Sequence, residues 1–60
     1  MQKLVAKEDG HLKYVELAGV STEEKPTGGN LCTGSSFLEV DTGDVYLYNE
    51  ADTAWYKVGG

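Results

Sequence analysis

Three residues carry side chains that could do chemistry: His11, Cys32 and Asp41. A cysteine becomes a nucleophile only when a base or a positive group activates its thiol. The one histidine is far from Cys32 in sequence, and neither residue has a second His or Cys at metal-ligand spacing. The sequence therefore predicts a structural thiol at Cys32 and a residue at a strand end for His11.

Asp41 begins the tripeptide Asp41-Thr42-Gly43, which follows the apolar residues Leu38 and Val40. This order resembles the active centre of aspartic proteases, in which two aspartates share a proton and activate water, so that a homodimer would supply both. Asp44 stands where those proteases have a small residue, and their fold is longer than this chain. Asp, Thr and Gly also suit a hairpin turn. We therefore expect Asp41, Thr42 and Gly43 to form a turn, and we expect no enzymatic activity.

Acidic and amide side chains gather around two predicted turns, at Asp41, Asp44, Asn49, Glu50 and Asp52. Such oxygens could hold a hard cation, but they lack the alternating spacing of a calcium-binding loop. We expect solvated turn residues there, no metal and no other cofactor.

The charge balance excludes some partners. The 60 residues include 5 Lys and Arg against 10 Asp and Glu, for a net charge of −5. Binding to nucleic acid needs several cations on one face, so it is not expected. No run of residues is apolar enough for a membrane span or a signal peptide. A domain this small has a marginal core, and one cysteine cannot form an internal disulfide, so extra stability has to come from packing or self-association.

Short runs of Val, Tyr, Thr, Phe and Trp alternate with Gly, Asp, Asn and Ser, and no stretch keeps apolar residues at helical spacing. These patterns predict one all-β domain over residues 1–60, built on a small antiparallel sheet. A β-hairpin at 3–17 and a three-stranded meander at 37–58 are joined by a long connector at 18–36, rich in Gly, Ser and Thr. A connector of this length packs over something or becomes ordered on meeting a partner.

Turn lengths predict the strand registers. A three-residue loop at 8–10 would place Lys7 opposite His11 and Leu4 opposite Tyr14. A three-residue loop at 41–43 would pair Leu38 with Tyr46.

Both faces of the predicted meander carry large apolar groups, so both need a cover. We expect the hairpin to cover one face and a second copy of the chain to cover the other. The aromatic residues could instead stack on sugars or bases, but core and subunit contacts use such residues more often. The predicted core or oligomer interface consists of Leu4, Leu12, Tyr14, Phe37, Leu38, Val45, Tyr46, Leu47, Tyr48, Trp55 and Tyr56.

Several short motifs follow one another from Leu17 onward. They are Ser21-Thr22, Lys25-Pro26-Thr27, Gly34-Ser35-Ser36-Phe37, Asp41-Thr42-Gly43, the aromatic strand Val45-Tyr46-Leu47-Tyr48, the acidic turn Asn49-Glu50 and Trp55. This order resembles small virion-associated proteins of tailed bacteriophages and prophages. The resemblance implies a structural or decoration protein, of the head-fibre, capsid-accessory or tail type, that is assembled in the bacterial cytoplasm and resides in the virion. It also implies self-association, as a dimer or trimer, and contacts with other virion proteins.

A second hypothesis makes the chain a small acidic regulator or inhibitor encoded by a phage. It would bind a basic host protein through Glu8, Asp9, Glu23, Glu24 and the acids of the meander turns.

Overall fold

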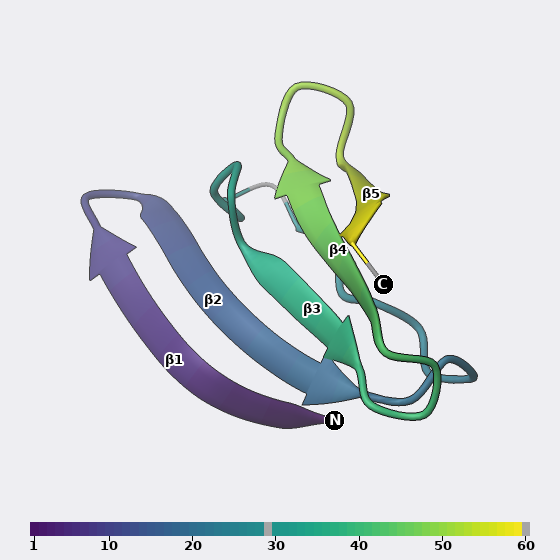
Figure 1. Cartoon of the computed structure of the whole chain (residues 1–60). Helices are drawn as coiled ribbons and strands as arrows, with labels where there is room; N and C mark the ends of the chain where they lie inside the picture. Colours follow the sequence, from purple (N-terminus) through teal and green to yellow (C-terminus); the bar gives the residue numbers. More distant parts are fainter. Residues whose placement is uncertain (29, 60) are drawn as a thin grey trace.

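All regular structure lies in one five-stranded sheet, in a computed structural model that describes residues 1–28 and 30–59. The strands are β1 (Gln2–Asp9), β2 (Leu12–Gly19), β3 (Ser36–Glu39), β4 (Asp44–Asn49) and β5 (Ala54–Gly59), and their order in the sheet is their order in the chain (Figure 1). The prediction of an all-β fold with an N-terminal hairpin and three C-terminal strands is confirmed. One pair, β2 with β3, is parallel, so the sheet is mixed.

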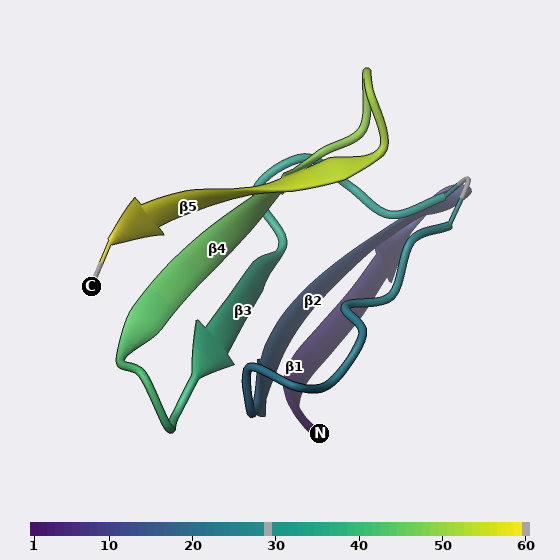
Figure 2. The same cartoon turned by 90° about the vertical axis from the view of Figure 1, so that its right-hand side faces the viewer.

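The parallel pair follows from the connector. Two parallel neighbours need a crossover of a dozen or more residues, and residues 20–35 supply one. This segment runs across one face of the sheet (Figures 1 and 2). The expectation that the hairpin covers the meander is wrong, because β1 and β2 continue the same sheet edge to edge. The connector covers that face instead.

The first hairpin is tighter than expected. Asp9 pairs with Leu12, so the loop contains only Gly10 and His11, and Gly10 has a φ of 64°. Glycine with positive φ at the first of two loop positions is typical of a type II′ turn, whose twist matches that of the strands. The predicted register is therefore wrong, and Lys7 lies opposite Tyr14 rather than His11.

The other two loops each contain four residues, at 40–43 and 50–53. Gly43 has a φ of 79°, and its amide donates to the carbonyl of Glu39 at 2.7 Å. The longer loop pairs Leu38 with Val45, so the predicted pairing of Leu38 with Tyr46 is wrong by one residue. In the second loop the last residue is Thr53, with a φ of 50°, a backbone conformation that a β-branched residue adopts with strain.

The core lies between the sheet and the connector. It contains Val15, Leu17, Leu31, Phe37 and Tyr48, with Tyr46 and Trp55 packed against it. Phe37, Tyr46, Tyr48 and Trp55 come from the predicted set, whereas Val15, Leu17 and Leu31 do not. Leu12 and Tyr14 are half-buried and alternate with the core residues of β2.

Ser35 links the end of the connector to β2 through a hydrogen bond of its side chain. Leu31 forms a parallel bridge with Lys13, and β3 begins only at Ser36. Between these points the fully buried Ser35 hydroxyl accepts a hydrogen bond from the Val15 amide at 3.1 Å. The side chain thus occupies the place of a missing backbone partner, and the Val15 amide is satisfied.

Candidate functional site

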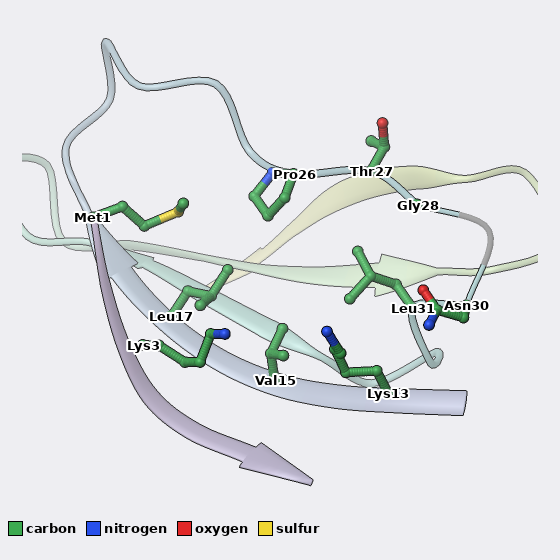
Figure 3. A pocket seen from close by; sticks show the side chains of 10 residues that line it. All are labelled: Met1, Lys3, Lys13, Val15, Leu17, Pro26, Thr27, Gly28, Asn30 and Leu31. Carbon is green, nitrogen blue, oxygen red and sulfur yellow. The ribbon is translucent and has the colours of Figure 1, made fainter. Parts of the chain in front are cut away.

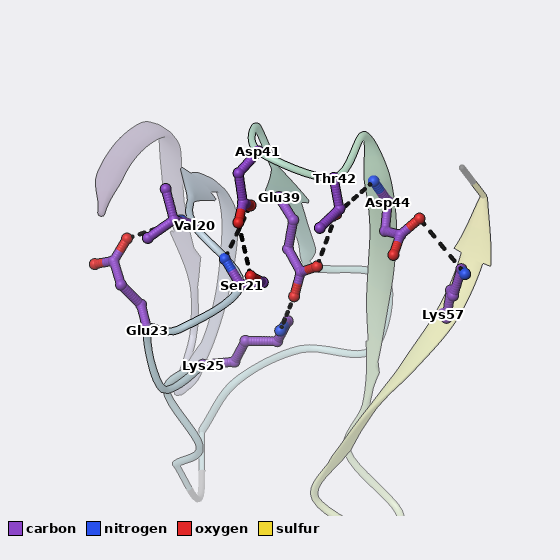
Figure 4. Close-up of polar contacts among 9 residues, drawn as sticks. All are labelled: Val20, Ser21, Glu23, Lys25, Glu39, Asp41, Thr42, Asp44 and Lys57. Carbon is purple, nitrogen blue, oxygen red and sulfur yellow. Dashed lines mark hydrogen bonds and ion pairs between the residues drawn. The ribbon is translucent and has the colours of Figure 1, made fainter.

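Asp41 ties the β3–β4 loop to the connector. Its Oδ1 accepts from the backbone amide of Ser21 at 2.9 Å, and its Oδ2 accepts from the Ser21 hydroxyl at 2.7 Å (Figure 4). These hydrogen bonds favour the charged carboxylate and hold the pKa of Asp41 below its ordinary value, the Ser21 hydroxyl first. The carboxylate of Asp-Thr-Gly is therefore used in a structural contact within the chain.

A buried ion pair lies beside this contact. Glu39 is 4% exposed, and its carboxylate accepts from Lys25 Nζ at 2.6 Å and from the Thr42 hydroxyl at 2.9 Å (Figure 4). The Lys25 ammonium also lies 4.1 Å from the ring centre of Tyr46 and 4.9 Å from that of Phe37. Both a carboxylate and two ring faces therefore stabilise one charge of the connector.

Trp55 is bound by the next connector residue. Its Nε1 donates to the carbonyl of Pro26 at 2.8 Å. The indole packs edge-to-face on Tyr48 and Phe37, with ring centres 5.1 and 6.2 Å apart. Burial of the indole is thus coupled to the position of the connector.

The start of the connector is fixed by Glu23. Its carboxylate accepts from the Val20 amide at 2.9 Å and pairs with the N-terminal ammonium at 2.8 Å. These contacts lower the pKa of Glu23, the N-terminal hydrogen bond first. Gly19 packs against both Glu23 and Phe37. A β-carbon added at position 19 would lie 2.6 Å from Glu23 Oε1 and 2.8 Å from Phe37 Cζ. Any larger residue at position 19 would therefore displace the Glu23 carboxylate or the Phe37 ring.

These contacts bring together motifs that are far apart in sequence. We call the set Ser21, Lys25, Glu39, Asp41 and Thr42 the connector clasp. Its members other than Glu39 come from the Ser-Thr, Lys-Pro-Thr and Asp-Thr-Gly motifs, and Trp55 and Phe37 lie next to it. Three of the motifs on which the resemblance depends therefore supply residues that hold the connector on the sheet.

The opposite face of the sheet is open. Paired residues share a face, which places Leu38 beside Val45, and Leu47 beside Tyr56, on the side away from the connector. Leu38 and Leu47 are each 37% exposed and Tyr56 is 50% exposed, while Val45 is half-buried. We call these four residues the open face. Leu4, also in the predicted set, is exposed at a β-bulge of β1.

The acidic turn residues do not form one cluster. The β3–β4 and β4–β5 loops lie at opposite ends of β4 (Figure 1). Asp44 pairs with Lys57 at 3.5 Å, and Asp52 accepts from the Tyr56 hydroxyl. Among the side chains that the structure describes, no group of three His, Cys, Asp or Glu residues is arranged to hold a metal ion.

The remaining reactive side chains lie apart from the clasp. His11 is exposed in the β1–β2 turn. Cys32 is half-buried and lines a hollow of about 260 Å³ with Lys7, Leu12 and Tyr14. Over the described part of the chain, no helix could span a membrane.

We compared the chain with known protein families, curated proteins and solved structures. No protein-family model, curated protein or solved structure matches this chain.

Proposed function

We propose that this chain is a small structural β module that works by protein–protein contact, with a second copy of itself on the open face. The observation that carries the proposal is that Leu38, Leu47 and Tyr56 are exposed, next to the half-buried Val45, on the uncovered side of the sheet. Adjacent exposed apolar side chains on a small protein mark contact surfaces. Burying them against a copy would complete the sheet's second face.

The clasp supports this proposal because it occupies the other face. With the connector bound through Lys25–Glu39 and Ser21–Asp41, the chain covers one side of its sheet by itself. The side that needs a cover is then the open face. A rigid sheet with one free apolar side suits a building block of a larger assembly.

The resemblance of the motifs to virion-associated proteins of tailed phages supports a place for this module in a virion. In a virion the module would be a decoration, head-fibre or tail component. It would be assembled in the bacterial cytoplasm and would contact its own copies and other virion proteins. It acts without catalysis, cofactor, nucleic acid or membrane.

The acidic side chains favour this role over that of a regulator of a basic host protein. Glu23 and Asp41 already accept hydrogen bonds inside the chain, and Asp44 pairs with Lys57. The side chain of Asp9 lies outside the described part of the structure. Acids bound internally contribute less to an outward-facing charged surface.

Sedimentation equilibrium over a wide concentration range tests the proposal. We expect a dimer or trimer for the natural chain, and dissociation to monomers after Leu47→Lys or Tyr56→Lys, because each substitution puts a charge on the open face. Leu4→Lys is the matched control, since Leu4 is 58% exposed on β1 and its substitution should leave the mass unchanged. A natural chain that stays monomeric at every concentration would contradict self-association, and salt-sensitive binding to a basic host protein would then favour the regulator.

A further inference from the structure

A cavity of about 300 Å³ lies between the connector and the β1–β2 side of the sheet (Figure 3). Val15 and Leu17 of β2 form its floor, and Pro26 and Leu31 of the connector form its opposite wall. Its volume is at the lower end of the range for small-molecule sites, which are mostly apolar with a few polar groups. The cavity can therefore take the apolar part of a small ligand.

Two lysines give this cavity a positive charge. Lys3 and Lys13 line it: the Lys13 side chain rises from β2 on the same side as Val15, and the Lys3 side chain extends from β1 towards Leu17 and Val15 (Figure 3). Two other lysines, Lys25 and Lys57, are held in ion pairs. Among the side chains that the structure describes, which do not include that of Asp9, no carboxylate lies at ion-pair distance from Lys3 or Lys13.

The neighbouring charges do not neutralise these two lysines. Glu8 lies opposite Lys13 across the β1–β2 hairpin but forms no ion pair with it. The N-terminal ammonium of Met1, also at the cavity, is already paired with Glu23. A chain with a net charge of −5 thus presents, among its described side chains, two ammonium groups without carboxylate partners at one apolar cavity. Charge complementarity favours an anion there.

We propose that this cavity binds a small amphipathic anion. Its apolar chain lies against Val15, Leu17 and Leu31, and its anionic head contacts Lys3 and Lys13. Lysine is a compact charge on a flexible stem and imposes little geometry on its partner. A carboxylate head on a short alkyl chain therefore satisfies the site, and octanoate is a suitable probe.

Octanoate titrated into the isotope-labelled full chain tests the proposal by NMR. We expect saturable shifts of the methyl signals of Val15, Leu17 and Leu31, and weaker binding of octanol, which lacks the charge, and of acetate, which lacks the alkyl chain. Shifts confined to Leu38 and Leu47 would place octanoate on the open face and overturn the proposal, as would the absence of saturable shifts.

Charge variants test the role of the two lysines. An exposed ion pair contributes up to about 1 kcal/mol, which corresponds to about fivefold in the dissociation constant. We therefore expect Lys3→Gln and Lys13→Gln each to weaken octanoate binding by about fivefold. Lys7→Gln is the matched control, because it removes the same charge beside Tyr14 and Cys32, at a different hollow. Equal weakening in all three variants would show a general charge effect and overturn the proposal.

Discussion

Replacing Lys25 with methionine should destabilise the fold strongly. Methionine keeps an unbranched side chain but removes the ammonium, which contacts Glu39 at 2.6 Å and lies over the rings of Phe37 and Tyr46. The Glu39 side chain is only 5% exposed and would retain a single side-chain donor, the Thr42 hydroxyl. Removing one partner of a buried ion pair costs about 3–5 kcal/mol. Because the Lys25 side chain is 16% exposed, we expect the low end, about 3 kcal/mol.

That loss is large for a domain of this size. At about 0.05–0.15 kcal/mol per residue, a 60-residue chain has a free energy of unfolding of about 3–9 kcal/mol. Lys25→Met should therefore lower the urea midpoint markedly or leave the chain partly unfolded in buffer. The fluorescence of Trp55 reports the transition, since its indole binds the connector carbonyl of Pro26.

A double-mutant cycle separates the ion pair from other effects. Glu39→Gln in the Lys25→Met background removes the unpaired charge but keeps an acceptor for Thr42, so we expect it to restore about 2 kcal/mol. Lys57→Met is the matched control, because it removes the same charge from a pair whose lysine side chain is 56% exposed, and it should cost less than about 1 kcal/mol. If Lys25→Met cost no more than Lys57→Met, or if the second substitution restored nothing, the clasp would not be what holds the connector.

Three further predictions concern single positions. Thr53→Gly should stabilise the fold by about 0.5–1 kcal/mol, because it removes the strain of a left-handed β-branched residue, whereas Gly43→Thr should destabilise it; thermal melting checks both, and equal signs would contradict the argument. Ser35→Ala should cost about 1–3 kcal/mol and accelerate hydrogen exchange of the Val15 amide, which loses its acceptor; unchanged exchange would show another partner. The folded-state pKa of Asp41 is lowered, so its contribution to stability is complete above the ordinary pKa of 3.8 and is lost as the pH falls through the folded value. Asp41→Asn should flatten the acid part of the stability profile, measured by melting from pH 7 downwards, and an unchanged profile would assign that slope to other carboxylates.

The fold class was predictable from the sequence because strand runs and turn residues alternate so regularly. The chain-order neighbours β1–β2, β3–β4 and β4–β5 were each expected as hairpins. The predicted registers of β1–β2 and β3–β4 were wrong, because loop length was judged from residue types alone. The Gly10–His11 loop is one residue shorter than expected and the loop at 40–43 is one longer, and an odd change in register exchanges the two faces of a strand.

The connector was the part least open to prediction. Its buried Leu31 lies beside Cys32 in an otherwise polar stretch, and two adjacent apolar residues give no periodic signal. The parallel pairing of β2 with β3 depends on contacts such as Ser21–Asp41 and Lys25–Glu39, whose partners are far apart in sequence. The motifs were visible in the sequence as an ordered series. That they meet in space could be seen only once the sheet order was known.

The parallel β2–β3 pair also has a consequence for how the chain folds. The β1–β2 and β4–β5 hairpins close short loops and can form from local contacts, but an isolated hairpin is marginal in water. Joining β2 to β3 requires closing the whole segment 20–35, and that entropy is lost before Phe37 and Leu17 come together. We therefore expect docking of the connector to be the step that turns two unstable hairpins into one cooperative unit.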